Sequence, residues 1–374
     1  MINVLHLRDT DRVCGPGKTI LETCCRIDKS RYNLSIGLLL LESETNNQYW
    51  EAARKRNVQV VPVRSKSQYS TEIIDSIVKA VKDNNINIIH SHEYKSDILA
   101  VLAARKIDVP IITTAHGWIT NSLKSKLYIW LGKQSFRFFE RVIAVSPKIR
   151  EEVLRHGTKK DKVQLIYNAI VVEDYQPDDY EPGYLRNRFG IHPDTKIIGN
   201  VGRLSPEKGQ VEFIRAAVQV LVRYKNVCFV LIGEGPDRQS LERLVRELKL
   251  ENKIFFTGYE PNVRPAYRDL DVLALTSFTE GFPNVLLESL CMQVPVLAAD
   301  VGGVADIVAD RVTGVLVQPG DIEAIGAGLI DLISDEEFAH STVLEGQAKI
   351  ARKFEFSQRV AKIEALYDDV MNGV

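Results

Sequence analysis

The chain has 374 residues, more than one hydrophobic core usually organises, so we expect two domains. Apolar residues make up 45% and charged residues 26% of the sequence, which excludes a disordered, collagen-like or membrane-embedded protein. The formal net charge is −1, and this near-neutral balance argues against a nucleic-acid binder.

Charge is unevenly divided along the chain. Residues 1–175 carry 27 Lys and Arg against 19 Asp and Glu, whereas the remaining residues carry 21 against 30. The positive excess in the first half favours contact with an anionic partner, because clustered charge of one sign attracts its opposite.

The cysteines and the apolar runs indicate a cytoplasmic protein. The five cysteines are odd in number and unpatterned, which is typical of a reducing compartment, and no Cys/His spacing resembles a zinc site. The first residues read as a strand and not as a signal peptide. Apolar runs such as 36–41 are far shorter than a membrane span requires.

Short β-branched runs alternate with helical patterns along the whole chain. This alternation predicts an α/β fold with parallel sheets that are covered by helices on both faces. The expected strands are 3–8, 34–41, 58–63, 86–91, 111–115, 141–145 and 163–166 in the first half and 197–201, 227–232, 254–257, 272–275, 295–299 and 314–317 in the second. The expected helices include 71–84, 96–105, 209–224, 237–248, 285–292 and 357–371.

The two halves predict two Rossmann-like domains, 1–175 and 191–356. The segment 176–190 begins Gln-Pro-Asp-Asp-Tyr-Glu-Pro-Gly, has no periodicity and is the expected linker. The last stretch, 357–374, follows all the strands, so it either caps the second domain or crosses back to the first.

The segment 279–288, Thr-Glu-Gly-Phe-Pro-Asn-Val-Leu-Leu-Glu, directly follows a predicted strand. Ligands of open parallel sheets bind beyond the carboxyl ends of the strands. Pro283 and Asn284 are typical of a helix start, whose free amides suit a diphosphate. Glu280 can accept hydrogen bonds from sugar hydroxyls, and Glu288 can hold the hydroxyl pair of a ribose. A surface loop with two solvated glutamates is the alternative.

A second segment, 199–209, reads Gly-Asn-Val-Gly-Arg-Leu-Ser-Pro-Glu-Lys-Gly and also follows a predicted strand. Arg203 presents a planar fork and Lys208 a compact charge, a suitable pair for neutralising a diphosphate leaving group. Two solvated cations in a turn are the alternative.

These segments occur in order with Gly233-Glu234-Gly235-Pro236, Phe256-Thr257-Gly258-Tyr259, Pro295-Val296 and Val301-Gly302-Gly303. Together they resemble the retaining GT-B glycosyltransferases of family 4, also called glycosyl transferases group 1. The similarity extends over essentially the whole chain and is densest between 199 and 319. It implies two Rossmann-like domains that face each other across a cleft, with the acceptor bound by the first.

The resemblance also implies a role for each matching residue. Arg203 and Lys208 would bind the donor diphosphate, Glu288 the ribose and Glu280 the transferred sugar. Further donor contacts would come from Gly281, Phe282, Pro283, Asn284 and Val285, and the base would lie against Gly258 and Tyr259. The co-substrate would be a nucleotide-diphosphate sugar, with a UDP-sugar favoured, and no other cofactor is expected.

Two features of the first half also match the family. His116 follows a predicted strand, where similar enzymes use a histidine on the donor sugar; an ordinary core or surface histidine is the alternative. Gly15 and Gly17 open the first helix, where glycines let the backbone approach a phosphate or an acceptor. The segment mimics a Walker loop, but Arg12 stands where the first glycine of that loop belongs, so a P-loop NTPase is rejected.

The segment 123–141 is basic and amphipathic. As one helix it would place Lys126, Lys133 and Arg137 on one side, beside a face of leucine and aromatic residues. One hypothesis is that this helix meets an anionic membrane surface on the inner face of the membrane, where a lipid-linked acceptor lies. The other is that it buries its aromatic residues in the first domain.

The expected reaction is transfer of a hexose-type sugar to a glycan or lipid-linked acceptor, in the synthesis of a surface polysaccharide or glycoconjugate. No Asp-x-Asp motif marks a metal-bound diphosphate, so metal independence is expected. The family implies retention of anomeric configuration. A nucleotide-sugar 2-epimerase and a non-catalytic sugar-nucleotide sensor are the alternatives.

Overall fold

The structure is a computed structural model that describes residues 1–67, 71–118 and 123–373, without the side chains of 123–125. The chain forms two compact units. The first comprises Met1–Asn168 and Ser357–Val374, and the second comprises Ala169–Phe356. The last helix of the chain therefore belongs to the same unit as the first strand.

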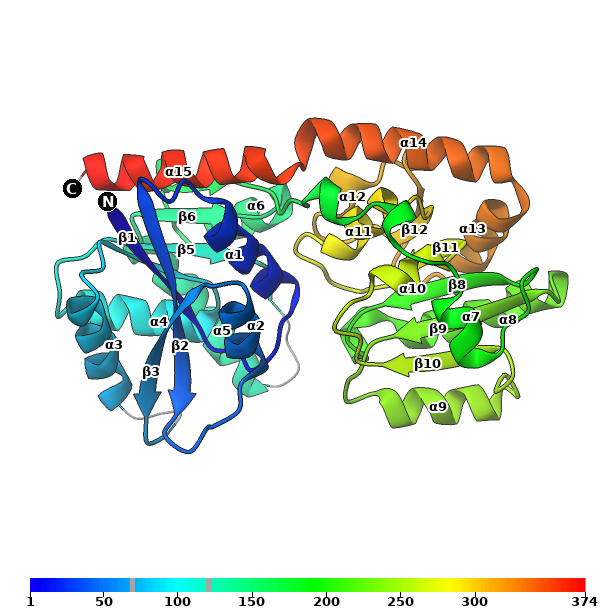
Figure 1. Cartoon of the computed structure of the whole chain (residues 1–374), viewed down its shortest axis with the longest axis horizontal. Helices are drawn as coiled ribbons and strands as arrows, with labels where there is room; N and C mark the ends of the chain where they lie inside the picture. The colour runs from blue at the N-terminus through cyan, green and yellow to red at the C-terminus, as the bar shows by residue number, and fades with distance from the viewer. Residues whose placement is uncertain (68–70, 119–122, 374) are drawn as a thin grey trace. The chain divides into compact units, whose positions relative to one another are not determined.

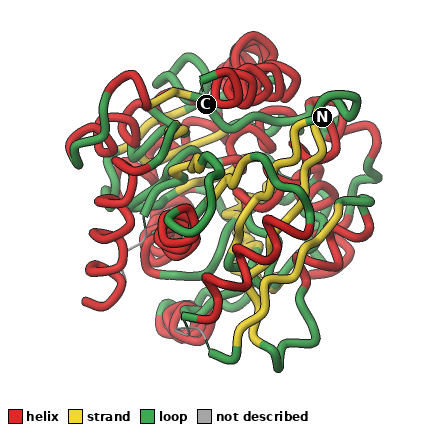
Figure 2. The backbone as a smooth tube through the Cα atoms, turned by 90° about the vertical axis from the view of Figure 1, so that its left-hand side faces the viewer, coloured by secondary structure: helices red, strands yellow, loops and turns green. Residues whose placement is uncertain are grey.

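The first unit contains seven strands and, among its described residues, seven α-helices with two 3₁₀ turns. The strands are β1 (Ile2–Arg8), β2 (Tyr32–Leu41), β3 (Gln59–Ser65), β4 (Ile88–Ser91), β5 (Ile111–Ala115), β6 (Arg141–Ala144) and β7 (Val163–Leu165). The helices are α1 (Gly15–Arg26), α2 (Gln48–Lys55), α3 (Glu72–Asp83), α4 (Tyr94–Ala104), α5 (Leu123–Ser135), α6 (Pro147–Arg155), α15 (Phe356–Asn372), η1 (Phe136–Phe138) and η2 (Lys160–Lys162). The strands form one parallel sheet in the order β3-β2-β1-β4-β5-β6-β7, with helices on both faces (Figure 2).

The second unit repeats this plan with a six-stranded parallel sheet in the order β10-β9-β8-β11-β12-β13 (Figure 1). Its strands are β8 (Lys196–Val201), β9 (Val227–Ile232), β10 (Ile254–Gly258), β11 (Val272–Leu275), β12 (Val296–Ala299) and β13 (Val315–Val317). Its helices are α7 (Tyr184–Phe189), α8 (Gln210–Arg223), α9 (Arg238–Glu247), α10 (Arg264–Arg268), α11 (Asn284–Cys291), α12 (Val304–Ile307), α13 (Ile322–Ser334) and α14 (Glu336–Lys353), with 3₁₀ turns η3 (Val172–Asp174), η4 (Pro177–Asp179) and η5 (Pro206–Lys208).

The predicted strand runs are confirmed, since each of the thirteen overlaps a strand of the structure. Every residue of β9 and of β11 is buried, as parallel strands between two helix layers must be. Right-handed crossovers place helices on opposite faces on either side of the point where the strand order reverses. That point lies between β1 and β4 in the first sheet and between β8 and β11 in the second.

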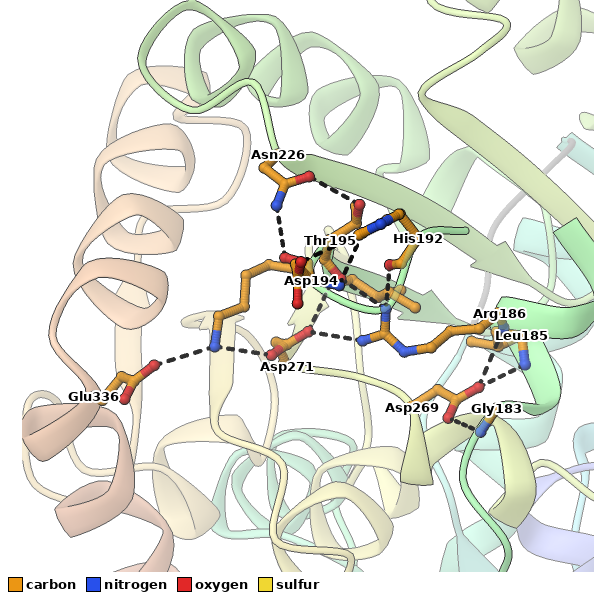
Figure 3. Close-up of polar contacts among 12 residues, drawn as sticks. Gly183, Leu185, Arg186, His192, Asp194, Thr195, Asn226, Asp269, Asp271 and Glu336 are labelled. Carbon is orange, nitrogen blue, oxygen red and sulfur yellow. Dashed lines mark hydrogen bonds and ion pairs between the residues drawn. The ribbon is translucent and has the colours of Figure 1, made fainter. Parts of the chain in front are cut away.

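The segment expected to be a linker, 176–190, contains η4 and α7 and is tied to the second unit by carboxylates (Figure 3). Asp269 accepts hydrogen bonds from the backbone N–H groups of Gly183 and Leu185, each at 2.6 Å, at the start of α7. Asp271, which accepts from the Ile197 N–H of β8 at 2.7 Å, lies 4.0 Å from the Arg186 guanidinium of α7. The Asp269 bonds cap α7, so this segment folds as part of the second unit.

The single helix expected over 123–141 is wrong beyond Ser135, where α5 ends and η1 follows. Phe136 and Phe139 stand three residues apart and are both buried, and a 3₁₀ turn brings residues at this spacing onto one side. Strand β6 begins at Arg141, which pairs with Ile112 of β5, so the chain must leave the helix before that residue, and Phe139 is already extended. Of the described helices, none is long and apolar enough to cross a membrane.

Candidate functional site

The loops that follow β8 and β11 lie side by side at the reversal point of the second sheet, where open α/β sheets bind ligands. The β8 loop carries Arg203 and Lys208, and the β11 loop carries Glu280. The structure thus brings two of the three residues into direct contact. The Lys208 Nζ lies 2.7 Å from Glu280 Oε1, and Ser277 Oγ donates to the same oxygen at 2.7 Å.

The Lys208–Glu280 pair is only partly screened by water, since the two side chains are 23% and 10% exposed. Among the described residues no hydrogen bond reaches Glu280 Oε2, which leaves this oxygen able to accept one from a ligand hydroxyl. The site therefore presents a carboxylate acceptor beside a cation.

A buried polar network holds the two loops together. The Asn200 side chain on β8 donates to the carbonyl of Ala274 on β11 at 2.9 Å. Thr276 Oγ1 donates back to the carbonyl of Gly209 at 2.8 Å, and the Gln210 side chain donates to the carbonyl of Arg203 at 2.9 Å. These bonds satisfy buried backbone groups that would otherwise oppose folding, so they set the position of Lys208.

Glycines let neighbouring loops touch through their backbones. Gly209 has φ +64°, and a Cβ there would lie 2.0 Å from the carbonyl oxygen of Thr276. Gly302, in the loop after β12, has φ +56°, and its Cβ would lie 1.7 Å from the carbonyl oxygen of Glu280. Next to it, the Gly303 N–H donates to the Gly281 carbonyl at 2.9 Å. A side chain at position 209 would push the Lys208 loop away from the loop after β11, and one at position 302 would push the loop after β12 away from Glu280.

Glu288 is buried one turn into α11, where its carboxylate accepts from Tyr175 Oη at 3.1 Å and from Tyr267 Oη at 3.0 Å. Burial, followed by the adjacent Glu288 charge, raises the pKa of both phenols above its ordinary value, so both remain hydroxyl donors. The two tyrosines were not predicted from the sequence. Tyr175 directly follows η3 and Tyr267 lies on α10, and no local motif links either element to α11.

The other predicted donor-site residues lie around this pair. Helix α11 begins at Asn284, as the predicted helix start requires, with Pro283 as its N-cap; Pro283 itself offers no side-chain cap. Gly281 and Phe282 precede it, and Phe282 is buried against Phe354 with 5.2 Å between ring centroids. Of the remaining predicted donor-site residues, Val285 is half-buried and Gly258 ends β10. Tyr259 and Arg203 are exposed.

In the first unit, His116 directly follows β5 and is half-buried. Its Nδ1 is buried without a hydrogen-bond partner among the described residues. Three further histidines that were not predicted, His6, His90 and His92, lie beside it in stacked or tilted ring contacts. The sequence signal was the His-Ser-His at the end of the strand run 86–91. The described residues contain one group of three that could hold a metal ion, and it is this trio, with ligand atoms within 4.8 Å.

Burial lowers the pKa of all four histidines, to about 3 for His6, with the nearby cations Arg8 and Arg359 acting in the same direction on His6 and His116. The four rings are therefore neutral at pH 7. Arg8 itself is fully buried, and its Nη2 pairs with Glu93 at 2.8 Å.

Gly15 and Gly17 lie at the start of α1. A Cβ on Gly17 would lie 2.8 Å from the Tyr49 ring, whose hydroxyl donates to the Gly17 carbonyl at 3.3 Å. The packing of Tyr49 against α1 therefore accounts for the glycine at position 17.

Family models match both units. Residues 184–349 match the family described as glycosyl transferases group 1, and residues 35–174 match the one described as glycosyltransferase family 4. The two ranges together take in most of the chain.

Two relatives are similar over most of their length. The N-acetyl-alpha-D-glucosaminyl L-malate synthase of Bacillus anthracis is 26% identical over 310 residues, which are 81% of this chain and 80% of the relative. The UDP-Gal:alpha-D-GlcNAc-diphosphoundecaprenol alpha-1,3-galactosyltransferase of Escherichia coli is 25% identical over 305 residues, 79% of each chain.

Solved structures share the fold. The crystal structure of Anabaena HepE in complex with UDP-glucose matches with a TM-score of 0.88 at 20% identity, over 99% of this chain and 100% of that one. Sucrose-phosphate synthase from Thermosynechococcus elongatus matches with a TM-score of 0.82 at 17% identity, over all of both chains. The architecture is therefore that of two Rossmann-like α/β domains, the GT-B fold.

We expect Gly302→Ala to lower the free energy of unfolding by more than about 2 kcal/mol, because the new Cβ displaces the Glu280 backbone in addition to straining φ. Gly190→Ala is the matched control, since Gly190 has φ +64° with nothing near its Cβ, and it should cost only about 1 kcal/mol. Urea unfolding measures both. Equal losses in the two variants would show that the Gly302 contact does not hold the Glu280 loop.

We expect the free energy of unfolding to fall as the pH is lowered from about 7 to about 5. The unfolded histidines bind protons near their ordinary pKa of 6.5, whereas the folded ones have a lowered pKa and do not, so stability present above pH 6.5 is lost below it. Each histidine contributes at most about 1.4 kcal/mol per pH unit. Asp97 and Glu93 act in the opposite direction, since burial raises the pKa of both carboxyls, that of Asp97 to about 7.

His6→Gln should make this decline shallower in urea unfolding measured between about pH 5 and 8. His192→Gln should leave it unchanged, because His192 is exposed at the surface of the second unit. A decline of the same slope in wild type and His6→Gln would contradict burial of His6 in its neutral form.

Proposed function

This chain belongs to the glycosyl transferases group 1 family, and we propose that it moves a hexose from a nucleotide-diphosphate sugar to a glycan or lipid-linked acceptor with retention of anomeric configuration and without a metal ion. The product would enter a surface polysaccharide or glycoconjugate. The favoured donor is a UDP-sugar.

The position of Lys208 and Glu280 is the observation that carries this proposal. Their loops follow the two central strands of the second sheet, at the edge where parallel sheets bind nucleotides. A cation at this edge can neutralise a diphosphate, and a carboxylate beside it can orient the attached sugar through its hydroxyls. Lys208 and Glu280 together thus offer a cation for the diphosphate and a carboxylate for the sugar of a nucleotide-sugar donor.

The remaining donor contacts follow from the same edge of the sheet. Arg203 has no ion-pair partner among the described residues, so its exposed guanidinium is available for the diphosphate. The N-terminus of α11, which begins at Asn284, adds backbone N–H donors and a favourable dipole. We assign the ribose to Glu288, the base to Gly258 and Tyr259, and the transferred sugar to Glu280 and His116.

The proposed reaction is a front-face substitution at the anomeric carbon. The acceptor oxygen forms the new glycosidic bond on the same face from which the phosphate oxygen leaves, and the acceptor proton passes to that phosphate oxygen. The products are the glycoside and the nucleoside diphosphate. Lys208, Arg203 and the α11 amides stabilise the negative charge that grows on the leaving group.

The relatives support the choice of donor and acceptor. The Escherichia coli galactosyltransferase is named for a UDP-Gal donor and a diphosphoundecaprenol-linked acceptor, and a structural neighbour was crystallised with UDP-glucose. A capsular polysaccharide biosynthesis glycosyltransferase of Staphylococcus aureus, 25% identical over 300 residues, supports a polysaccharide product.

A nucleotide-sugar 2-epimerase and a non-catalytic sensor are not favoured. An epimerase isomerises its nucleotide sugar without an acceptor, and a sensor binds the donor without turnover. The two family models and the relatives named for transfer support a transferase instead.

We expect one UDP-sugar, in a panel of UDP-, GDP- and ADP-sugars without metal, to release nucleoside diphosphate slowly by hydrolysis. Mass spectrometry of the nucleotide products measures this release. Lys208→Met should lower the rate by at least about 100-fold, the usual effect of removing one group that stabilises a developing negative charge. Glu280→Gln should lower it as well, since the sugar loses its orienting carboxylate.

Lys196→Met is the matched control, because Lys196 lies at the opposite end of β8 and pairs with Asp271 at 3.2 Å. Its rate should stay within about twofold of wild type, which is what a lost surface ion pair implies. Isomerised donor would identify an epimerase, and binding of UDP without any turnover, even with acceptors, would identify a sensor. Wild-type rates in Lys208→Met and Glu280→Gln would refute the assigned site.

Exposed apolar side chains on α5 and η1 support a second part of the proposal, that the enzyme meets its acceptor at the inner face of a membrane. Lys126 and Arg137 are exposed beside them, whereas Lys133 is paired with Glu152 and lies over the Trp118 ring. The apolar side chains and their exposed fractions are Leu127 at 58%, Trp130 at 52%, Leu131 at 40% and Phe138 at 53%. Such a surface suits the headgroup region of an anionic bilayer.

We expect the double variant Leu127→Ser/Trp130→Ser to float with phosphatidylglycerol-containing vesicles at least about tenfold less than wild type. Each large apolar side chain removed from water contributes roughly 1.5–3 kcal/mol. Val222→Ser/Leu344→Ser removes two exposed apolar residues of the second unit and should float as wild type does. Undiminished flotation of the first variant would rule out this surface as the membrane contact.

A further inference from the structure

Six side chains of the first unit form one continuous chain of hydrogen bonds that ends at His116. Every member except His116 is almost fully buried. The contacts run from Thr114 Oγ1 to His90 Nε2 (2.8 Å), His90 Nδ1 to Tyr367 Oη (2.9 Å), Tyr367 Oη to His6 Nε2 (3.3 Å), His6 Nδ1 to His92 Nε2 (2.8 Å) and His92 Nδ1 to His116 Nε2 (3.3 Å).

The parallel sheet explains why these residues meet. His6 on β1 and His90 on β4 are paired in register, and alternate residues of a strand point to the same face. His90 on β4 and His92, directly after it, therefore lie on that face. So do Thr114 on β5 and His116, directly after it. Helix α15 supplies Tyr367, the central member of the chain.

Each member of the chain has both a donor and an acceptor role. The lowered pKa of the four histidines keeps them neutral, so each ring has one N–H and one bare nitrogen. A hydroxyl likewise donates once and accepts from the other side. The direction of one bond then determines the direction of all the others, and only two proton arrangements satisfy the whole chain.

The two arrangements differ at the ends of the chain. In the first, Thr114 donates to His90 and every histidine carries its proton on Nδ1, so His116 Nδ1 is a donor. In the second, every histidine carries its proton on Nε2, His116 Nδ1 is an acceptor, and the buried Thr114 hydroxyl needs another acceptor. Among the described residues no hydrogen bond from Thr114 Oγ1 other than that to His90 is present. The first arrangement leaves one end group, His116 Nδ1–H, without a partner among the described residues, whereas the second leaves both the Thr114 hydroxyl proton and His116 Nδ1 without one, so the first is favoured.

We propose that this chain, through Thr114 and Tyr367, holds His116 in the Nδ1–H form, so that His116 donates a hydrogen bond to an oxygen of the transferred sugar. Thr114, His90, Tyr367, His6 and His92 are positioning residues, because they act through His116. The inference rests on the proposed function only for the identity of the ligand at His116 Nδ1. The tautomer itself follows from the contacts within the first unit.

A metal ion held by His6, His90 and His92 is the competing account of the same cluster. The facing nitrogens of these rings are already engaged by Tyr367, Thr114 and one another. His90 and His92 are stacked, with centroids 4.3 Å apart and an interplanar angle of 25°. The contacts therefore favour the hydrogen-bond chain.

Long-range ¹H–¹⁵N spectra of the full-length protein labelled with ¹⁵N-histidine test the proposal directly. All four buried histidines should show a protonated Nδ1 and a bare Nε2. Tyr367→Phe removes the central hydroxyl and should give His116 a mixture of both tautomers. Thr114→Val removes the terminal donor with the same result, and Thr114→Ser should restore the wild-type spectrum.

Transfer kinetics supply the functional half of the test. Tyr367→Phe should lower kcat about tenfold with little change in the KM for the donor, the size expected for the loss of one oriented hydrogen bond. Tyr32→Phe is the matched control: Tyr32 is buried and donates to Asp368 on the same helix α15 at 2.6 Å, but it is not part of the chain. The histidine tautomers of Tyr32→Phe should match those of wild type, and its kcat should stay within about twofold of wild type.

Protonated Nε2 in the wild-type histidines, or an unchanged His116 tautomer in both Tyr367→Phe and Thr114→Val, would overturn the proposal. So would stoichiometric zinc bound by the protein as purified, detected by elemental analysis together with loss of the His6 and His90 N–H signals. Full transfer by His116→Ala would overturn the role of His116 while leaving the tautomer in place. If wild type turns over no donor, the proposed function fails, and the spectra still decide whether the chain fixes the tautomer.

Discussion

Close backbone contact at the carboxyl end of the second sheet is the constraint on which the candidate site depends. The loops after β8, β11 and β12 approach so closely that a Cβ at Gly209 or Gly302 would overlap a carbonyl oxygen of the next loop. The buried hydrogen bonds of Asn200 and Thr276 also hold the loops after β8 and β11 together. Lys208 and Glu280 meet because their backbones are already placed. A partly exposed ion pair contributes little to stability, so the pair is a consequence of the packing and remains available for a ligand.

The interior of the first unit holds a cluster of neutral histidines. Its four neighbouring histidines are kept uncharged by burial, and the buried Arg8 is paired with Glu93. Lys133, one of the cations expected at a membrane, is paired with Glu152.

Helix α15 completes the first unit, although it is the last element of the chain. Tyr367 contacts His90 and His6, and Arg359 donates to the backbone carbonyl of Tyr167 at 2.7 Å. Tyr32 and Arg31 bind Asp368 on the same helix. The interior of this unit, and with it the environment of His116, therefore depends on residues at the end of the sequence.

The sequence by itself determined the strands, their parallel pairing into two domains, the loops that carry Lys208 and Glu280, and the helix start that places Glu288. These features are local, because strand runs and helix starts depend on residues near one another in the chain, and the fold class follows from their alternation. Only the tertiary structure decided that α5 ends at Ser135, because the chain must become extended before Arg141 pairs with β5. It also decided the surroundings of His116: Tyr367 and His6 are 361 residues apart, and no pattern of spacing relates residues that only a folded sheet and its covering helix bring together.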